Sequence, residues 1–143
     1  MNVGALLAKK GTFVATTGPG ATVRTAVATL VRHRIGALVV VSDTGSVEGI
    51  VSERDIVTHL DGTGPDVLDA VVRTIMSSDV QTCAPGDDLA SLMEVMTDRR
   101  IRHLPVVQAG VLGGIVSIGD VVKARVDSLE VERRALDDYI HAR

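Results

Sequence analysis

A serine followed three positions later by an aspartate occurs twice in this 143-residue chain in the same context. The pairs are Ser52 with Asp55 and Ser117 with Asp120, and each pair directly follows Gly-Ile-Val. A serine at the start of a helix can donate to a phosphate oxygen, where unpaired N–H groups and the helix dipole already favour an anion. An aspartate one turn later can accept hydrogen bonds from both ribose hydroxyls. This spacing suits a nucleotide, and two copies predict two related pockets.

The same spacing has a second interpretation that concerns the helix alone. Ser-x-x-Asp is close to a capping box, in which the two side chains satisfy the first turn of a helix. A single copy of the motif favours capping. The two roles are compatible, because in an empty site the serine can cap the helix.

Both motifs belong to a longer internal repeat. Residues 14–20 align with 80–86, and residues 35–41 align with 101–107. The offset is 85 − 19 = 66 at the aligned prolines and 114 − 49 = 65 at the aligned glycines. A repeat of this length in two copies is too long and too few for a solenoid. It predicts a duplicated α/β unit whose halves bury a face against each other.

Hydrophobic periodicity predicts the order strand, helix, strand, strand, helix in each half. A lead-in helix precedes each half, at 3–10 and 67–76. The first half is predicted as a strand at 12–17, a helix at 21–34, strands at 36–41 and 47–51, and a helix at 52–60. The second half has a helix beginning near Asp88, strands at 103–107 and 111–116, and a long helix from 118 to about 141.

Composition narrows the class of protein. Hydrophobic residues make up 45% of the chain, the net charge is −3, and aromatic residues are one Phe and one Tyr. A weakly acidic chain with few aromatic side chains does not suit nucleic acid. The lone Cys83 excludes disulfides and cysteine-based metal sites within one chain. No apolar run is long enough to span a membrane, so we expect a cytoplasmic protein. His33, His59 and His141 have no partner at ligand spacing, so no metal site is expected.

The repeat resembles a tandem pair of CBS domains, also called a Bateman module, over about residues 6–125. The resemblance is carried by Leu104-Pro105-Val106-Val107 and by both Gly-apolar-x-Ser-x-x-Asp motifs. It implies an α/β (α+β) fold of two βαββα repeats related by pseudo-two-fold symmetry, with small sheets packed against helices. Residues 1–62 would form the first repeat with its lead-in helix. Residues 63–143 would form the second, with the linker, its lead-in helix and the extended C-terminal helix.

Within a CBS pair, the duplicated motif favours nucleotide contact, and the resemblance implies two clefts between the halves. One cleft would bind ribose and phosphate through Ile115, Ser117, Gly119 and Asp120, and adenine through Gly11, Thr12, Gly36 and Ala37. The mirror cleft would use Ile50, Ser52, Arg54 and Asp55, with Ser78, Asp79, Arg102 and His103 near the base.

The two implied clefts are unlike in charge. Arg102 and His103 lie where the family often places basic groups facing a phosphate, so they could serve either cleft, although a rim role for His103 stays open. Their counterparts Gly36 and Ala37 carry no charge. We expect the cleft that holds Asp120 to bind more tightly.

The leading hypothesis is a regulatory module, not an enzyme, that senses AMP, ADP or ATP. NAD and S-adenosylmethionine stay open as ligands. Such a module would signal through a homodimer or an unidentified regulated protein. The alternatives are a structural dimerisation module without a ligand and, less favoured, a nucleotide-processing enzyme. No catalytic motif occurs in the chain. The end of the long helix, with apolar Leu129, Leu136 and Ile140, is predicted to be solvated or dimer-facing.

Overall fold

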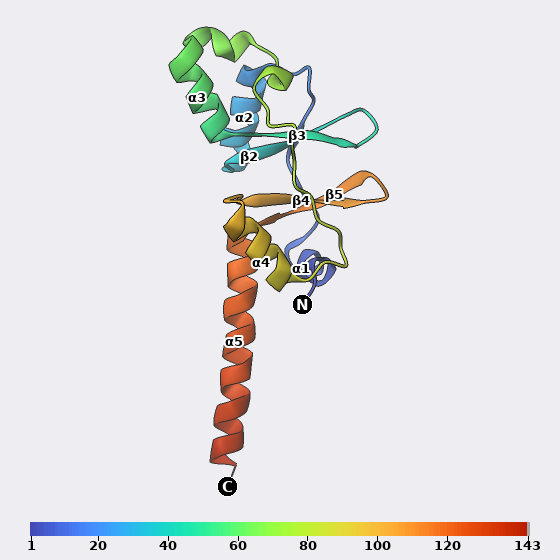
Figure 1. The fold of residues 1–143 in the computed structure, drawn as a ribbon, viewed down its shortest axis with the longest axis vertical. Coiled ribbons are helices and arrows are strands. Elements are labelled where there is room, and N and C mark those ends of the chain that lie inside the picture. The colour runs from blue at the N-terminus through green and yellow to red at the C-terminus, as the bar shows by residue number, and fades with distance from the viewer. Residues whose placement is uncertain (143) are drawn as a thin grey trace.

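The computed structural model describes residues 1–142 as two stacked halves, each a small sheet with helices on its outer side (Figure 1). The first half contains β1 (Thr16–Thr17), α2 (Val23–His33), β2 (Ala37–Val41), β3 (Val47–Ser52) and α3 (Glu53–Thr63). The second contains α4 (Leu89–Asp98), β4 (His103–Gln108), β5 (Val111–Ser117) and α5 (Ile118–His141). The chain opens with α1 (Val3–Lys10), and two 3-10 helices, η1 (Pro65–Asp69) and η2 (Val72–Thr74), join the halves.

The strand register places equivalent residues beside each serine motif. In the first sheet β1 runs parallel to β2, and β2 pairs antiparallel with β3, so that Ala37 lies opposite Ser52. In the second sheet β4 pairs antiparallel with β5, and His103 lies opposite Ser117. The serine then caps the following helix, which begins at the next residue. Both motifs therefore stand at a junction between strand and helix.

The hydrophobic cores of the two halves exchange their lead-in segments. Val3, Leu6 and Leu7 of α1 are buried in the core of the second half. In return, Val67 and Val72 of the two 3-10 helices are buried in the core of the first half. Burying side chains of this size contributes roughly 1.5–3 kcal/mol each. The segment at the start of the chain therefore completes the core of the second half, and the segment that joins the halves completes the core of the first.

Three predicted elements are wrong in detail. The predicted helix at 67–76 is instead two short 3-10 helices, because Val71 is extended and bridges to Thr22. The predicted strand at 12–17 shrinks to Thr16–Thr17. In the second half the first strand is reduced to a single parallel bridge from Cys83 to Val106. The sheet of the second half therefore has two named strands, where three were expected.

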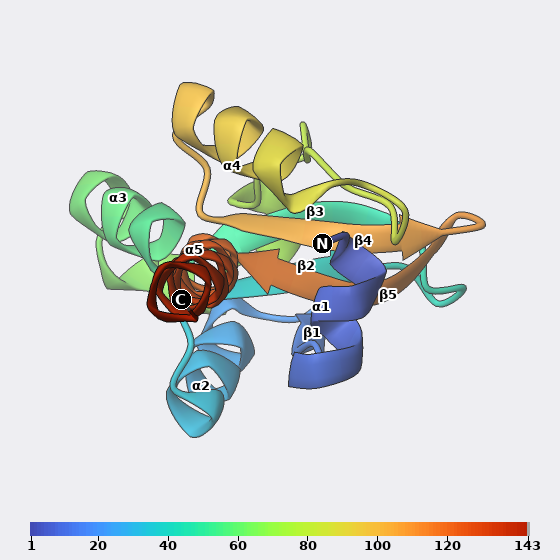
Figure 2. The same ribbon diagram turned by 90° about the horizontal axis from the view of Figure 1, so that it is seen from below.

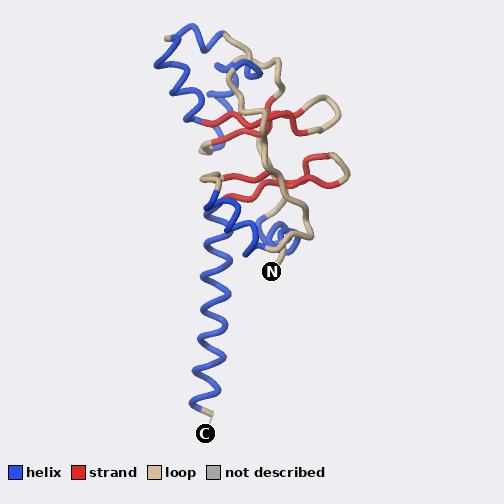
Figure 3. The backbone as a smooth tube through the Cα atoms, in the orientation of Figure 1, coloured by secondary structure: helices blue, strands red, loops and turns tan. Residues whose placement is uncertain are grey.

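The final helix matches its prediction and leaves the body of the protein. α5 spans 24 residues, and its lower part projects from the two halves with no element beside it (Figures 1 and 3). Viewed along this helix, the hairpin turns of both sheets lie on one side, and α2, α3 and α5 lie on the other (Figure 2). No helix within residues 1–142 is both long and apolar enough to cross a membrane.

Candidate functional site

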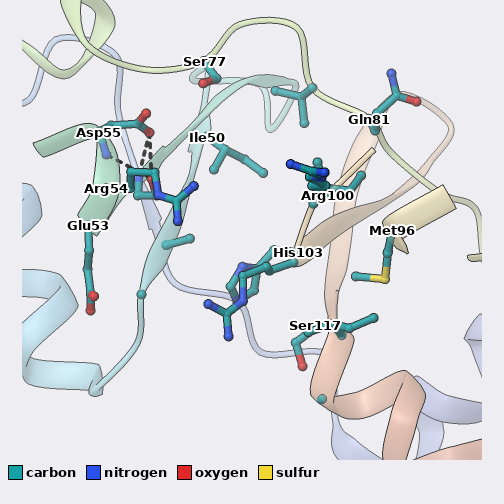
Figure 4. A pocket seen from close by; sticks show the side chains of 18 of the residues that line it. Ile50, Glu53, Arg54, Asp55, Ser77, Gln81, Met96, Arg100, His103 and Ser117 are labelled. Atoms are coloured by element: carbon teal, nitrogen blue, oxygen red, sulfur yellow. Dashed lines mark hydrogen bonds between the residues drawn. The ribbon is translucent and has the colours of Figure 1, made fainter. Parts of the chain in front are cut away.

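A cleft of about 1490 Å³ lies between the two halves and is lined by both. The first half contributes the junction of β3 and α3, including Ile50 and Ser52, and the second contributes the loop before β4 and the start of α5. Figure 4 shows Arg54, Arg100 and His103 around this space, which makes the cleft a meeting point of basic side chains from separate elements.

At the cleft wall Ser52 and Asp55 form a complete capping box. The Asp55 N–H donates to Ser52 Oγ at 3.2 Å, and the Ser52 N–H donates to Asp55 Oδ2 at 2.9 Å. The Ser52 hydroxyl also donates to Asp55 Oδ2, at 3.0 Å. All of these bonds to the carboxylate use Oδ2. The other oxygen, Oδ1, accepts no hydrogen bond from residues 1–142 and is free for a ligand.

The second motif forms the same box but carries an additional partner. The Ser117 N–H donates to Asp120 Oδ2 at 2.9 Å, and the Asp120 N–H donates to Ser117 Oγ at 3.1 Å. Lys10, in the last turn of α1, places its Nζ 2.5 Å from Asp120 Oδ2 and 2.9 Å from the carbonyl oxygen of Ile115. The lysine therefore neutralises the carboxylate of the second motif.

The ion pair also sets the charge state of Asp120. Burial alone would raise its pKa, but the hydrogen bonds from Lys10 and Ser117 outweigh burial and hold the pKa below its ordinary value. Asp120 is therefore an anion at neutral pH, with a cation already bound to it. The two serine motifs form the same capping hydrogen bonds, but only the carboxylate of the second motif is paired with a cation.

The cleft brings together most of the residues that the sequence singled out. It is lined by Gly36, Ala37, Ile50, Ser52, Arg54, Asp55, Asp79, Arg102, His103, Ser117 and Gly119. The remaining candidates, Gly11, Thr12, Ser78, Ile115 and Asp120, are not among its lining residues. One cleft thus brings together residues of both predicted clefts, whereas Asp120 lies outside its lining and is paired with Lys10.

Sequence reasoning missed Arg100, which also lines the cleft. The available signal was the run of basic residues at 99, 100 and 102, immediately before β4. Sequence reasoning also missed Lys10. Nothing local marks this lysine, because its partner Asp120 lies 110 residues away in the chain.

The arginines of the cleft form no ion pair with an acidic side chain within residues 1–142. Of the ion pairs within residues 1–142, none involves Arg54, Arg100 or Arg102. His103 is half-buried, and its pKa is lowered by burial first and then by the neighbouring Arg102. Its imidazole is therefore mainly neutral at pH 7 and can either donate or accept. Unpaired guanidinium groups in a cleft attract an anionic ligand.

Two other chemistries find no support in residues 1–142. No cluster of three His, Cys, Asp or Glu side chains in this part of the chain could hold a metal ion. The only thiol, on Cys83, is buried, and burial followed by the charge of Asp87 raises its pKa to about 11. It therefore stays protonated at neutral pH, and a protonated thiol is a poor nucleophile.

The duplicated fold, with its paired strand–helix junctions, defines a tandem repeat module. The family model of the CBS domain matches residues 12–62 and again residues 72–127. The chain therefore belongs to the CBS domain family and is a tandem CBS pair, which confirms the resemblance and the fold class predicted from the sequence. As a CBS pair, it is a regulatory module.

Several relatives share this architecture. The CBS-domain containing protein ATU1752 from Agrobacterium tumefaciens is 45% identical, with a TM-score of 0.83 over 87% of this chain and 99% of that one. The mitochondrial CBS domain-containing protein CBSX3 of Arabidopsis thaliana is 37% identical over 83% of this chain, which spans 60% of the relative's length. The CBS pair of protein MJ0100 shares the fold, with a TM-score of 0.79 at 22% identity over 90% of this chain and 98% of that one.

Proposed function

We propose that this CBS pair binds a phosphorylated adenine nucleotide, of the AMP, ADP or ATP type, in the cleft beside Ser52 and Asp55. The observation that carries the proposal is the convergence of Arg54, Arg100 and Arg102 on that cleft without a carboxylate partner. Clustered guanidinium groups bind phosphate in a bidentate manner and match its charge.

Each part of the ligand has a suitable neighbour. The free Oδ1 of Asp55 would accept from the ribose hydroxyls, and the positive end of the α3 dipole would face a phosphate. Arg102 and His103 belong to the second half, line the same cleft and would reach the phosphates from there. A nucleotide bound in this way would bridge the halves and fix their relative position.

Glu53, Asp55 and Asp79 line the cleft beside the three arginines, but the arginines form none of the ion pairs within residues 1–142 and therefore favour phosphates over other adenosyl compounds. S-adenosylmethionine carries a sulfonium cation, which would face the unpaired arginines. NAD carries a diphosphate and is compatible with the arginines. The CBS pair of MJ0100, which shares only the fold, was crystallised with 5′-methylthioadenosine and S-adenosylmethionine. We therefore rank phosphorylated nucleotides first, then NAD, and S-adenosylmethionine last.

The ranking of the two sites reverses the expectation from the sequence. Asp120 was expected to belong to the tighter cleft, but Lys10 already neutralises its carboxylate through Oδ2, which makes the remaining oxygen a weaker acceptor for a ribose. Asp55 has no such partner within residues 1–142. The open site beside Asp55 is therefore the tighter one in this proposal.

The bound state would act on assembly and not on chemistry, so the protein is not an enzyme in this proposal. A groove of about 400 Å³ between α2 and α3 is lined mainly by apolar side chains, including Val27, Val31 and Val57. Val31 and Val57 are 72% and 63% exposed, as is typical of an apolar surface that packs against another copy of the protein. This groove supports a homodimer, and also the alternative of a dimerisation module without a ligand. A cytoplasmic location and an unidentified regulated protein remain predictions.

Calorimetric melting and titration with AMP, ADP, ATP, NAD and S-adenosylmethionine test the proposal. A ligand at 100 times its dissociation constant should stabilise the protein by about 2.7 kcal/mol. Arg102→Ala should weaken ATP binding at least tenfold. Arg99→Ala is the matched control, since it removes the same charge from a residue outside the cleft lining. Absence of binding by all five compounds would favour the dimerisation module instead.

A further inference from the structure

The second half of α5 packs against no other element within residues 1–142. Every residue from Arg125 to Ala142 is exposed, and the match to the CBS domain ends at residue 127. In Figures 1 and 3 this part of α5 stands clear of both halves. An isolated helix of this length is only marginally stable in water, because helix propagation gains little per residue. A helical conformation here therefore indicates a partner that covers it.

The apolar residues of α5 follow a heptad spacing. Val122, Val126, Leu129, Leu136 and Ile140 are separated by 4, 3, 7 and 4 residues, and Arg133 divides the gap of 7 into 4 and 3. The five apolar side chains are between 45% and 64% exposed. A sustained alternation of 4 and 3 is the seam of a coiled coil, in which such residues pack into holes on a facing helix.

This seam is not the face that packs on the body. Val121 is buried in the core of the second half, and Ala124 packs against the same core. Val122 and Val126, on the adjoining face, are left 46% and 50% exposed. The seam therefore begins at the body and continues to the tip of α5 without interruption by a neighbour.

We propose that the seam of α5 forms an antiparallel coiled coil with α5 of a second copy. In the register that aligns the two seams over their full length, Val122 meets Ile140 of the second copy. Val126 then meets Leu136, and Leu129 meets Arg133, because each pair of residue numbers has the same sum. The antiparallel arrangement places one body at each end of the coil.

The place of Arg133 in the seam favours this direction over the parallel one. In the antiparallel register Lys123 lies beside Asp137 of the second copy, twice per dimer, while Glu130 and Glu132 each lie near their own counterparts at the centre of the coil. Each Arg133 then faces a leucine and lies near Glu130 of the second copy. A parallel pair would instead set Arg133 against Arg133 and Glu132 beside Asp137. Like charges at such positions disfavour a pairing, and opposite charges specify it.

Cysteine cross-linking tests both the contact and its direction. Full-length Val126→Cys and Leu136→Cys variants, carrying different tags, are co-expressed and then oxidised. We expect a disulfide between the two variants when they are mixed, and none when either is present alone. Ser128→Cys, a substitution away from the seam, is the control and should not cross-link. The native Cys83 is buried, so the unsubstituted chain should stay uncross-linked.

Three results would overturn the proposal. Cross-links within each single variant would show a parallel pair. A monomer by light scattering, without cross-links in the mixture, would show that another protein covers α5 or that nothing does. Cross-linking of Ser128→Cys to the same extent would show random collision.

The charge in the seam gives a second measurement that does not depend on oxidation. Arg133→Leu should tighten self-association at least tenfold by analytical ultracentrifugation, because it completes the apolar seam. Arg134→Leu is the matched control, since Arg134 lies off the seam, and it should change self-association little. An equal effect of both substitutions would contradict the seam. Neither variant touches the cleft, so ligand binding reports separately on the proposed function.

Discussion

The two serine motifs share one design and differ in what lies beside them. Both form a capping box at the same junction, with the serine N–H donating to the aspartate at 2.9 Å in each. Only Asp120 has a lysine partner, since Lys10 aligns, at the offset of 66, with the uncharged Met76. The comparison teaches that the motif fixes the hydrogen bonds between the serine and the aspartate. The segment before each half decides whether a cation is paired with the carboxylate.

The largest expected difference concerns the glycines that precede the two motifs. A Cβ on Gly49 would lie 2.7 Å from Met76 Sδ and 2.8 Å from the carbonyl oxygen of Ser77. A Cβ on Gly114 would lie 3.0 Å from a methyl group of Leu7, which can move. Because backbone cannot yield as a side chain can, Gly49→Ala should cost about 3 kcal/mol and Gly114→Ala about 1 kcal/mol. Urea unfolding measures both, and equal losses would show that the two lead-in segments pack with the same tolerance.

The next prediction compares the two aspartates directly. Asp55→Ala and Asp120→Ala each remove half of a capping box, at about 1 kcal/mol of stability, so each controls for the other. We expect Asp55→Ala to weaken ATP binding at least tenfold, because it removes the free carboxylate oxygen of the open cleft. Asp120→Ala should weaken it less than threefold. Isothermal titration measures the affinities, and a larger loss in Asp120→Ala would place the ribose at the second motif.

The smallest expected effect is on the ion pair that closes the second motif. Lys10→Met should cost at most about 1 kcal/mol at pH 7, as is usual for a partly exposed pair. The lowered pKa of Asp120 means that its contribution is complete above its unfolded pKa of about 4, and is lost as the pH falls through the lower folded value. Lys10→Met should therefore reduce the loss of stability in acid.

Lys9→Met is the control for this experiment, because Lys9 is exposed and makes no ion pair within residues 1–142. Urea unfolding at pH 7 and at several acidic values compares the three proteins. If the acid sensitivity of Lys10→Met equals that of the unsubstituted chain, the lysine does not hold the charge of Asp120.

Local signals in the sequence were enough for most of the framework. The branched run of β2, the capping boxes and the full length of α5 depend on neighbours a few positions apart, and each was predicted. The segment at 67–76 was predicted as a helix because its apolar spacing fits one, but Val71 pairs with Thr22 and interrupts it. The first strand of the second half was lost because Cys83 makes only one bridge. In both cases a distant partner decided the outcome.

The residues of the candidate site were likewise predicted where a local signal marks them and missed where a distant contact decides their role. Ser52 and Asp55 were found because the repeat marks them, and Arg102 and His103 because the resemblance to the CBS family implies them. The structure brings all four to one cleft. Arg100 has no counterpart in the motif, and the role of Lys10 depends on a contact across nearly the whole chain. Whether these residues bind a ligand stays a prediction until the titrations above are made.

The exchange of lead-in segments between the two cores has a consequence for the newly made chain. Val3 emerges from the ribosome early, yet its core is finished only by Val121, which is 121 − 3 = 118 residues later. At about 5–20 residues per second, that interval is roughly 6–24 s. During this time the apolar face of α1 has no place to pack, although the first half can close once Ile75 has emerged. The apolar face of α1 therefore stays without its core until the second half has been made, which favours contact with a chaperone during synthesis.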